Sequence, residues 1–139
     1  MIRALLAVAL AAALLAASMP AIESAATDRT AAALDRDIER IERAGRSLLA
    51  EDDPGARRVL TVKLPTDSLS SAGVDSFTID CSAHCEIRYR LDSGWSRTRR
   101  LTIPLTTPEG PIRLGSPGEH RLWLRLEQHD GGRVVELRA

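Results

Sequence analysis

The sequence predicts an α+β protein in which an N-terminal apolar helix runs into an amphipathic helix, followed by a small, mostly antiparallel β-sandwich or open barrel. Three observations predict it. Residues 4–22 contain no charged side chain, the apolar residues of 34–48 recur at helical spacing, and from Arg57 onward apolar residues alternate with polar ones. A chain of 139 residues has room for one folded domain with an appended segment. We therefore expect a signal peptide or membrane anchor over 1–22, an amphipathic stem over 23–53 and an extracytoplasmic β domain over 54–139.

The apolar run of residues 4–22 is long enough to span a membrane. As a helix it extends about 28 Å at ~1.5 Å per residue, close to the roughly 30 Å hydrocarbon core of a bilayer. Ala4, Leu10, Leu14 and Leu15 would then be anchor residues in contact with lipid. The alternative is a signal peptide removed at the small residues Ser24-Ala25-Ala26. Both interpretations make membrane lipid the first partner of the chain.

The charges at the two ends of the apolar run predict its orientation. Arg3 and the terminal amine precede the run, whereas Glu23 and Asp28 are the first charges after it. The positive-inside rule then places the N-terminus in the cytoplasm and the rest of the chain outside. The protein is expected to be either a single-pass membrane protein or a secreted one.

The stem carries a narrow apolar seam. Its members are spaced by 4, 3, 4 and 3 residues, as in a helix that packs along one face: Leu34, Ile38, Ile41, Gly45 and Leu48. The seam could pack on the protein's own domain or on neighbouring subunits, and the stem charges are expected to form a solvated face. Pro20 predicts a kink between the two helices, and Asp53-Pro54-Gly55 predicts the end of the stem.

The remaining residues predict short strands punctuated by Gly and Pro, as in a small sandwich or open barrel. The first strand holds Leu60, Val62 and Leu64 on one face, and Leu122, Leu124 and Leu126 share a face further on. Asp130-Gly131-Gly132 predicts a hairpin turn. The expected strands cover residues 57–64, 74–81, 85–91, 95–103, 111–114, 120–128 and 134–137.

Both cysteines flank a three-residue loop between two predicted strands. Opposed β positions bring Cα atoms within disulfide range, and oxidation is favoured outside the cytoplasm. The sequence therefore favours a Cys81–Cys85 disulfide at the end of a hairpin. Free thiols and a metal site with His84 are the alternatives, although three ligands in a crowded loop are one fewer than a zinc site needs.

Composition excludes several functions. The 19 basic residues balance the 19 acidic ones, and 3% of the residues are aromatic, which disfavours nucleic acid as a partner. No nucleophile, base and oxyanion set can be assembled, so we expect no enzyme, no cofactor, no metal and no small-molecule substrate. A basic stretch predicts a solvated outer sheet face, or else a surface for an acidic partner or lipid headgroups: Arg88, Arg90, Arg97, Arg99 and Arg100.

Four segments carry a resemblance to a known family: MIRALLAVALAAALLAA, PGARRVLTVKLP (54–65), SSAGVDS (70–76) and GEHRLWLRL (118–126). Together they resemble an uncharacterised family of small haloarchaeal proteins over most of the chain. The resemblance implies a setting near type IV pilus or secretion components. The junction Arg3-Ala4 is also similar to the point at which pilin-like subunits are trimmed before their apolar helix packs into a filament.

The sequence as a whole favours a non-enzymatic, membrane-anchored structural or accessory subunit, pilin-like, of a surface filament or secretion system. Its partners would be other small anchored subunits. The alternative is an exported soluble β-domain that binds a cell-surface ligand.

Overall fold

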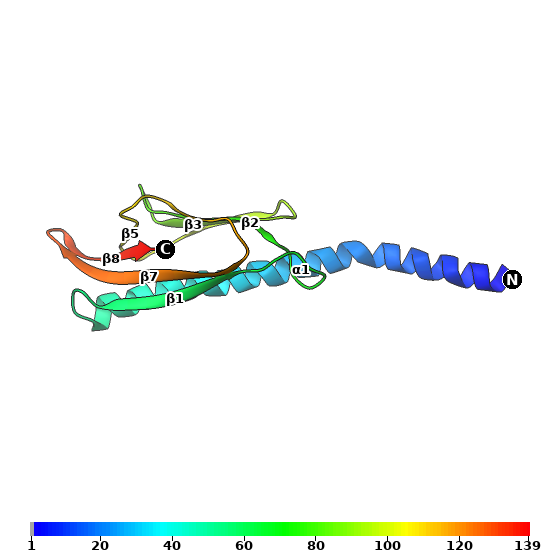
Figure 1. The fold of residues 1–139 in the computed structure, drawn as a ribbon, viewed down its shortest axis with the longest axis horizontal. Helices are drawn as coiled ribbons and strands as arrows, with labels where there is room; N and C mark the ends of the chain where they lie inside the picture. Colours follow the sequence, from blue (N-terminus) through cyan, green and yellow to red (C-terminus); the bar gives the residue numbers. More distant parts are fainter. Residues whose placement is uncertain (1) are drawn as a thin grey trace.

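The computed structural model describes residues 2–139, which form one long helix and two small β-sheets (Figure 1). The helix α1 covers Ile2–Glu51. The strands are β1 (Arg57–Leu64), β2 (Val74–Asp80), β3 (Glu86–Leu91), β4 (Ser96–Arg100), β5 (Leu105–Thr106), β6 (Ile112–Leu114), β7 (Gly118–His129) and β8 (Gly132–Arg138). The predicted α+β class is confirmed.

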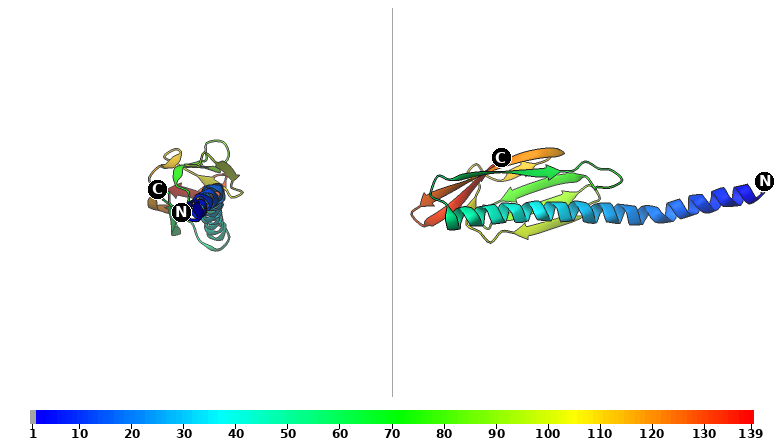
Figure 2. Two further views of the ribbon diagram at one scale, coloured as in Figure 1. Left: turned by 90° about the vertical axis from the view of Figure 1, so that its right-hand side faces the viewer. Right: turned by 90° about the horizontal axis from the view of Figure 1, so that it is seen from below.

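The apolar run continues directly into the amphipathic stem as one helix, as the sequence predicts, and only the kink expected at Pro20 needs correction. Pro20 lies inside α1 and leaves only a gentle curve, visible in the right-hand view of Figure 2. Proline removes a single intrahelical hydrogen bond, and the turns on either side keep theirs. The helix ends at Glu51 rather than at residue 53, because Pro54 disfavours the helical conformation of the residue before it.

The strands form two four-stranded sheets, in the orders β1-β7-β8-β5 and β4-β3-β2-β6. All pairings are antiparallel except that of β5 with β8. The two sheets do not close into a barrel. Figure 1 shows the C-terminal half of α1 running along β1 and β7, with β2 and β3 on the other side of the domain.

Two strand predictions need correction. The strand predicted over 95–103 ends at Arg100, because Leu101 and Ile103 leave the ladder and turn into the core. The short strand β5 that follows was not predicted. Its two residues pair in parallel with β8, whose residues lie thirty positions further along the chain. The local sequence around β5 therefore gives no indication of this pairing.

The apolar seam of α1 forms one wall of the core. Leu34, Ile38, Ile41 and Leu48 have no exposed surface, and the inward residues of both sheets surround them. Gly45 lies in the same row, where an added methyl group would overlap Cδ1 of Ile103. The seam therefore packs on the protein's own domain, the first of the two alternatives raised by the sequence.

The two halves of the helix should respond differently to the same truncation. Ile41→Ala removes a fully buried side chain and should lower the free energy of unfolding of the β domain by about 2–5 kcal/mol. Leu10→Ala removes one that is 63% exposed and should change it by less than about 0.5 kcal/mol. Denaturant unfolding of the detergent-solubilised chain, followed by tryptophan fluorescence, measures both. Equal effects of the two variants would contradict the observed packing.

Candidate functional site

The N-terminal half of α1 projects from the domain with its apolar side chains exposed. The bulky residues are between 43% and 75% exposed: Ile2, Leu5, Leu6, Val8, Leu10, Leu14, Leu15, Met19 and Ile22. Ala4, the remaining predicted anchor residue, is exposed as well. This surface surrounds the helix on all sides and has no partner within the described residues. An apolar surface of this extent is characteristic of a segment that is covered by lipid or protein.

The same half of α1 has the length and the apolar composition needed to cross a membrane, and none of its most apolar stretch is buried in the domain. A signal sequence at an N-terminus has the same properties. Length and composition are thus compatible with the predicted anchor and with the predicted signal peptide.

Burial begins at Ala26, where the helix meets two loops of the domain. The hydroxyl of Thr30 donates a hydrogen bond of 3.0 Å to the carbonyl of Ala72, in the loop before β2. The hydroxyl of Thr27 donates to the hydroxyl oxygen of Ser93 at 3.4 Å, in the turn between β3 and β4. The exposed apolar half of α1 therefore ends against the domain itself, with no flexible linker between them.

A partly exposed polar cluster around one buried tyrosine attaches the helix to β3 and β4. Tyr89 on β3 is fully buried, and its hydroxyl donates to Oδ1 of Asp35 at 3.1 Å. Arg97 on β4 forms an ion pair with the same carboxylate, and Arg99 lies 3.9 Å from it. The guanidinium of Arg97 also lies 5.0 Å from the ring centre of Trp95, within cation–π range. We call Asp35, Tyr89, Arg97 and Arg99 the Asp35 cluster.

Two further carboxylates attach the helix on either side. Glu42 accepts hydrogen bonds from the backbone N–H and the hydroxyl of Thr102, just after β4. The bond from the Thr102 hydroxyl is the main cause of the lowered pKa of Glu42, and Arg46 adds to it at 3.4 Å. On the opposite side, Asp37 accepts from the backbone N–H of Lys63 on β1 at 3.2 Å. The helix is thus held at the edges of both sheets.

These carboxylates correct the expectation that the stem charges form only a solvated face. Asp35, Asp37 and Glu42 lie beside the buried seam and face the domain. Their partners are 26 to 62 residues away in the chain, which is why helical spacing alone did not reveal them.

The predicted disulfide is present between Cys81 and Cys85. The cysteines fall just outside β2 and β3 rather than at the strand ends expected from the sequence, and they close the hairpin loop. Their sulfur atoms are bonded to each other and are not available as thiolates for a metal. Among residues 2–139, no group of three His, Cys, Asp or Glu side chains is placed to hold a metal ion.

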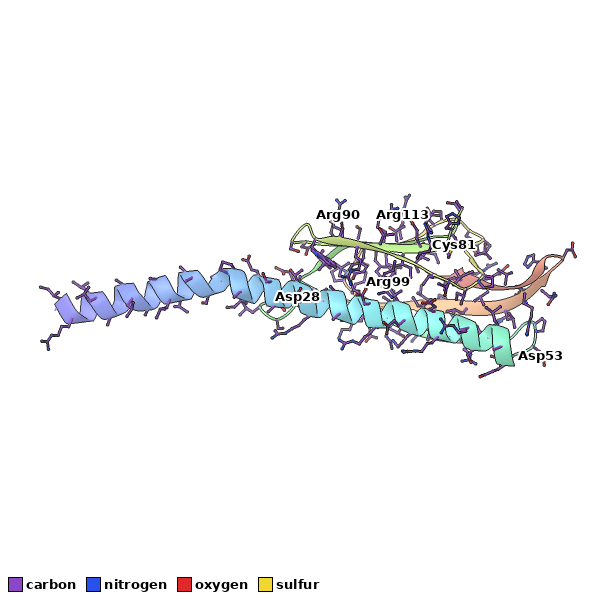
Figure 3. The ribbon with its side chains drawn as sticks, turned by 180° about the vertical axis from the view of Figure 1, so that it is seen from behind. Asp28, Asp53, Cys81, Arg90, Arg99 and Arg113 are labelled. Atoms are coloured by element: carbon purple, nitrogen blue, oxygen red, sulfur yellow. A yellow bond between two sulfur atoms is a disulfide. The ribbon has the colours of Figure 1, made fainter. Side chains whose placement is uncertain are left out.

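The predicted basic face is divided by the structure. Arg97 and Arg99 turn toward the helix as members of the Asp35 cluster. Figure 3 shows Arg90 and Arg113 projecting from the side of the sheet that faces away from α1, whereas Arg99 lies between sheet and helix. The outer face of the sheet is therefore less basic than the sequence suggested, and Glu86 forms an ion pair of 2.5 Å with Arg88 there.

The fold and these contacts define an α+β protein in which one N-terminal helix has an exposed apolar half and a second half built into the core of a disulfide-bonded two-sheet domain. The model of one protein family, a domain of unknown function designated DUF7311, matches residues 1–139. The chain belongs to this family. No curated protein and no solved structure matches it.

The Asp35 cluster can be tested through the only tyrosine of the chain. Burial, and then the negative charge of Asp35, raise the pKa of Tyr89 to about 12. In the unfolded chain the tyrosine pKa is about 10. Because the folded state keeps the proton longer, the contribution of Tyr89 to stability should be constant below about pH 10 and should fall between about pH 10 and about 12.

Absorbance at the phenolate band reports this titration directly, because no other tyrosine contributes. We expect a native midpoint near 12 and a denatured midpoint near 10. Tyr89→Phe should remove this contribution to the loss of stability at high pH. A native midpoint near 10 would show that the hydroxyl is not enclosed as observed.

Proposed function

We propose that the protein is a membrane-anchored, non-enzymatic subunit of a surface assembly, with a pilin-like organisation. One observation carries the proposal: a single helix has an apolar half that is fully exposed and a second half that forms one wall of the domain core. The exposed half would lie in the membrane or against the helices of neighbouring subunits. The resemblance of the sequence to haloarchaeal proteins near type IV pilus or secretion components supports the same class.

The rigid junction supports a structural role over simple tethering. A protein that only needs to remain near a membrane requires an anchor and a flexible linker. Here the apolar half continues into turns that are fixed by Thr30, Asp35 and Glu42. A displacement of the helix in an assembly would therefore move the whole domain with it.

The disulfide supports the proposed location of the domain. Disulfides persist in oxidising compartments and are rare in the cytoplasm. With Cys81 bonded to Cys85, we place the β domain outside the cell and the N-terminus inside. This is the orientation expected from Arg3 and Glu23.

A second apolar contact with the membrane surface follows from the same orientation. Leu69 is 84% exposed at the tip of the loop between β1 and β2. Ser68 and Ser71 hydrogen-bond across this loop and so hold the leucine outward. Leu69 lines one cleft together with Met19 and Ile22, at the end of the apolar run. We expect Leu69 to contact the headgroup region when the run spans the bilayer.

The alternative is an exported module from which the apolar half is removed. It is favoured by the position of Ser24-Ala25-Ala26, just where burial of the helix begins. Cleavage there would release the exposed residues and leave the seam, the Asp35 cluster and both sheets intact. The N-terminal residue of the mature protein separates the two functions. Ala4 supports the pilin-like subunit, Met1 supports a plain anchor, and a residue near Thr27 supports the soluble module.

Two arginines in the exposed half should displace the protein from the membrane. An arginine at the centre of a spanning helix costs about 2.5–3.5 kcal/mol on translocon scales. Leu10→Arg combined with Leu14→Arg should therefore abolish the carbonate-resistant membrane pool. Ala32→Arg with Ala50→Arg, at two exposed stem positions, is the matched control and should leave it unchanged. An unchanged membrane pool in the first variant would contradict anchoring by residues 4–22.

Assembly requires a separate test. A photo-crosslinking residue at Leu15, which is 69% exposed, should give adducts with small membrane proteins or with second copies of the chain. The photo-crosslinking residue placed at Arg43, which is exposed on the far side of the stem, is the control for random encounters. Adducts with lipid alone at Leu15 would support a simple membrane anchor and would contradict the proposed role as a subunit.

A further inference from the structure

Trp123 is the one aromatic residue of the chain that lies outside the aromatic core. Phe77, Tyr89 and Trp95 pack on one another, with ring centres 6.3 and 5.9 Å apart. Trp123 lies on the opposite sheet, on the face of β7 that points away from the core, and is 43% exposed. The exposed part of the indole is an apolar, aromatic surface that a ligand could cover.

The register of the sheet surrounds this indole with guanidinium groups. Val59 on β1 and Arg138 on β8 are the cross-strand partners of Trp123. Two residues further along each strand, on the same face, Arg57 lies directly opposite Arg125. Like charges that face each other across a ladder repel, and Glu136, the cross-strand partner of Arg125 on β8, lies on the other side of this pair. The exposed indole and this arginine pair are thus adjacent on one face.

The charges around Trp123 leave one guanidinium without an internal partner. Arg138 pairs with Glu109 at 2.8 Å and lies 3.5 Å from Glu136. Nε of Arg125 pairs with Glu127 at 2.6 Å. Arg57 forms no ion pair within the described part of the chain. An anion bound between Arg57 and Arg125 would relieve their repulsion and could accept bidentate hydrogen bonds.

The same side chains line a cleft of about 380 Å³, whose walls include Arg57, Glu109, Trp123, Arg125, Glu136 and Arg138. This volume is within the usual range for small-ligand sites, roughly 300–1,000 Å³. A protein partner would instead need an apolar centre and a total buried area above about 1,000 Å². Here the apolar residues of the lining are Trp123, Leu124 and Ala139, and the other five lining residues are charged.

We propose that this cleft binds an acidic saccharide. A sugar ring presents an apolar C–H face, which the negative face of the indole attracts. Its carboxylate would lie between Arg57 and Arg125, and its hydroxyls would donate to Glu109 and Glu136. The proposal does not depend on the membrane anchor, because every residue of the site belongs to the sheet β1-β7-β8 or to the loop before β6. It gives the extracytoplasmic domain a ligand at the cell surface.

Calorimetry of the full chain in detergent tests the site with two probes, a trimer of galacturonic acid and a neutral trimer of galactose. We expect the acidic probe to bind and the neutral probe to bind at least about tenfold more weakly. Trp123→Ala should lower the affinity for the acidic probe about tenfold, as expected for the loss of a stacking platform. Trp123→Tyr should restore part of this affinity. Arg57→Gln should lower the affinity for the acidic probe about fivefold and leave the affinity for the neutral probe unchanged.

Arg90→Gln is the matched control, because it removes the same charge from the outer face of the other sheet. The affinity of this variant for the acidic probe should equal that of the wild type, and every variant should show a cooperative thermal unfolding transition, as expected for a folded domain. An equal loss in Arg90→Gln and Arg57→Gln would mean unspecific attraction and would overturn the proposal. So would no binding by the wild type, or self-association that Trp123→Ala abolishes, since the face would then be an interface between copies.

Discussion

The packing of one helix face against two sheets is the constraint on which the rest of the structure depends. Leu34, Ile38, Ile41 and Leu48 are fully buried, and without them the inner faces of both sheets would be exposed on one side. A small two-sheet domain has little core of its own to lose. The segment that completes this core is also the continuation of the exposed apolar half, so folding of the domain and placement of the projecting helix are one event.

The polar contacts beside the seam determine how the helix is oriented. Apolar packing alone would allow small rotations and shifts along the axis, because hydrophobic contacts are not directional. Asp35, Asp37 and Glu42 accept hydrogen bonds from three different segments: β3, β1 and the loop after β4. These bonds are directional and lie on both sides of the seam. The direction in which the apolar half leaves the domain is therefore fixed, which is what a subunit of a regular assembly needs.

Local periodicity predicted the parts of the structure that depend on local sequence. The seam, the inward face of Leu122 to Leu126 and the disulfide hairpin all follow from spacing. The Asp35 cluster could not be predicted, because Arg97 pairs with Asp35 across 62 residues. The outward position of Trp123 was implicit in the alternation of β7. The arginines around it come from the pairing of β7 with β1 and β8, and single-strand patterns do not contain that information.

The apolar half and the buried half of α1 form one continuous helix, and we propose that this helix stays unbroken when the protein is in a membrane. Spin labels at Ala7→Cys and Ala32→Cys, both exposed, measure this directly in lipid. Twenty-five residues of continuous helix at ~1.5 Å each place the labelled positions about 37 Å apart, with a narrow distribution. A broad or clearly shorter distribution would show a break near Pro20, and loss of the label at position 7 would show that the apolar half is removed. Either result would contradict the account.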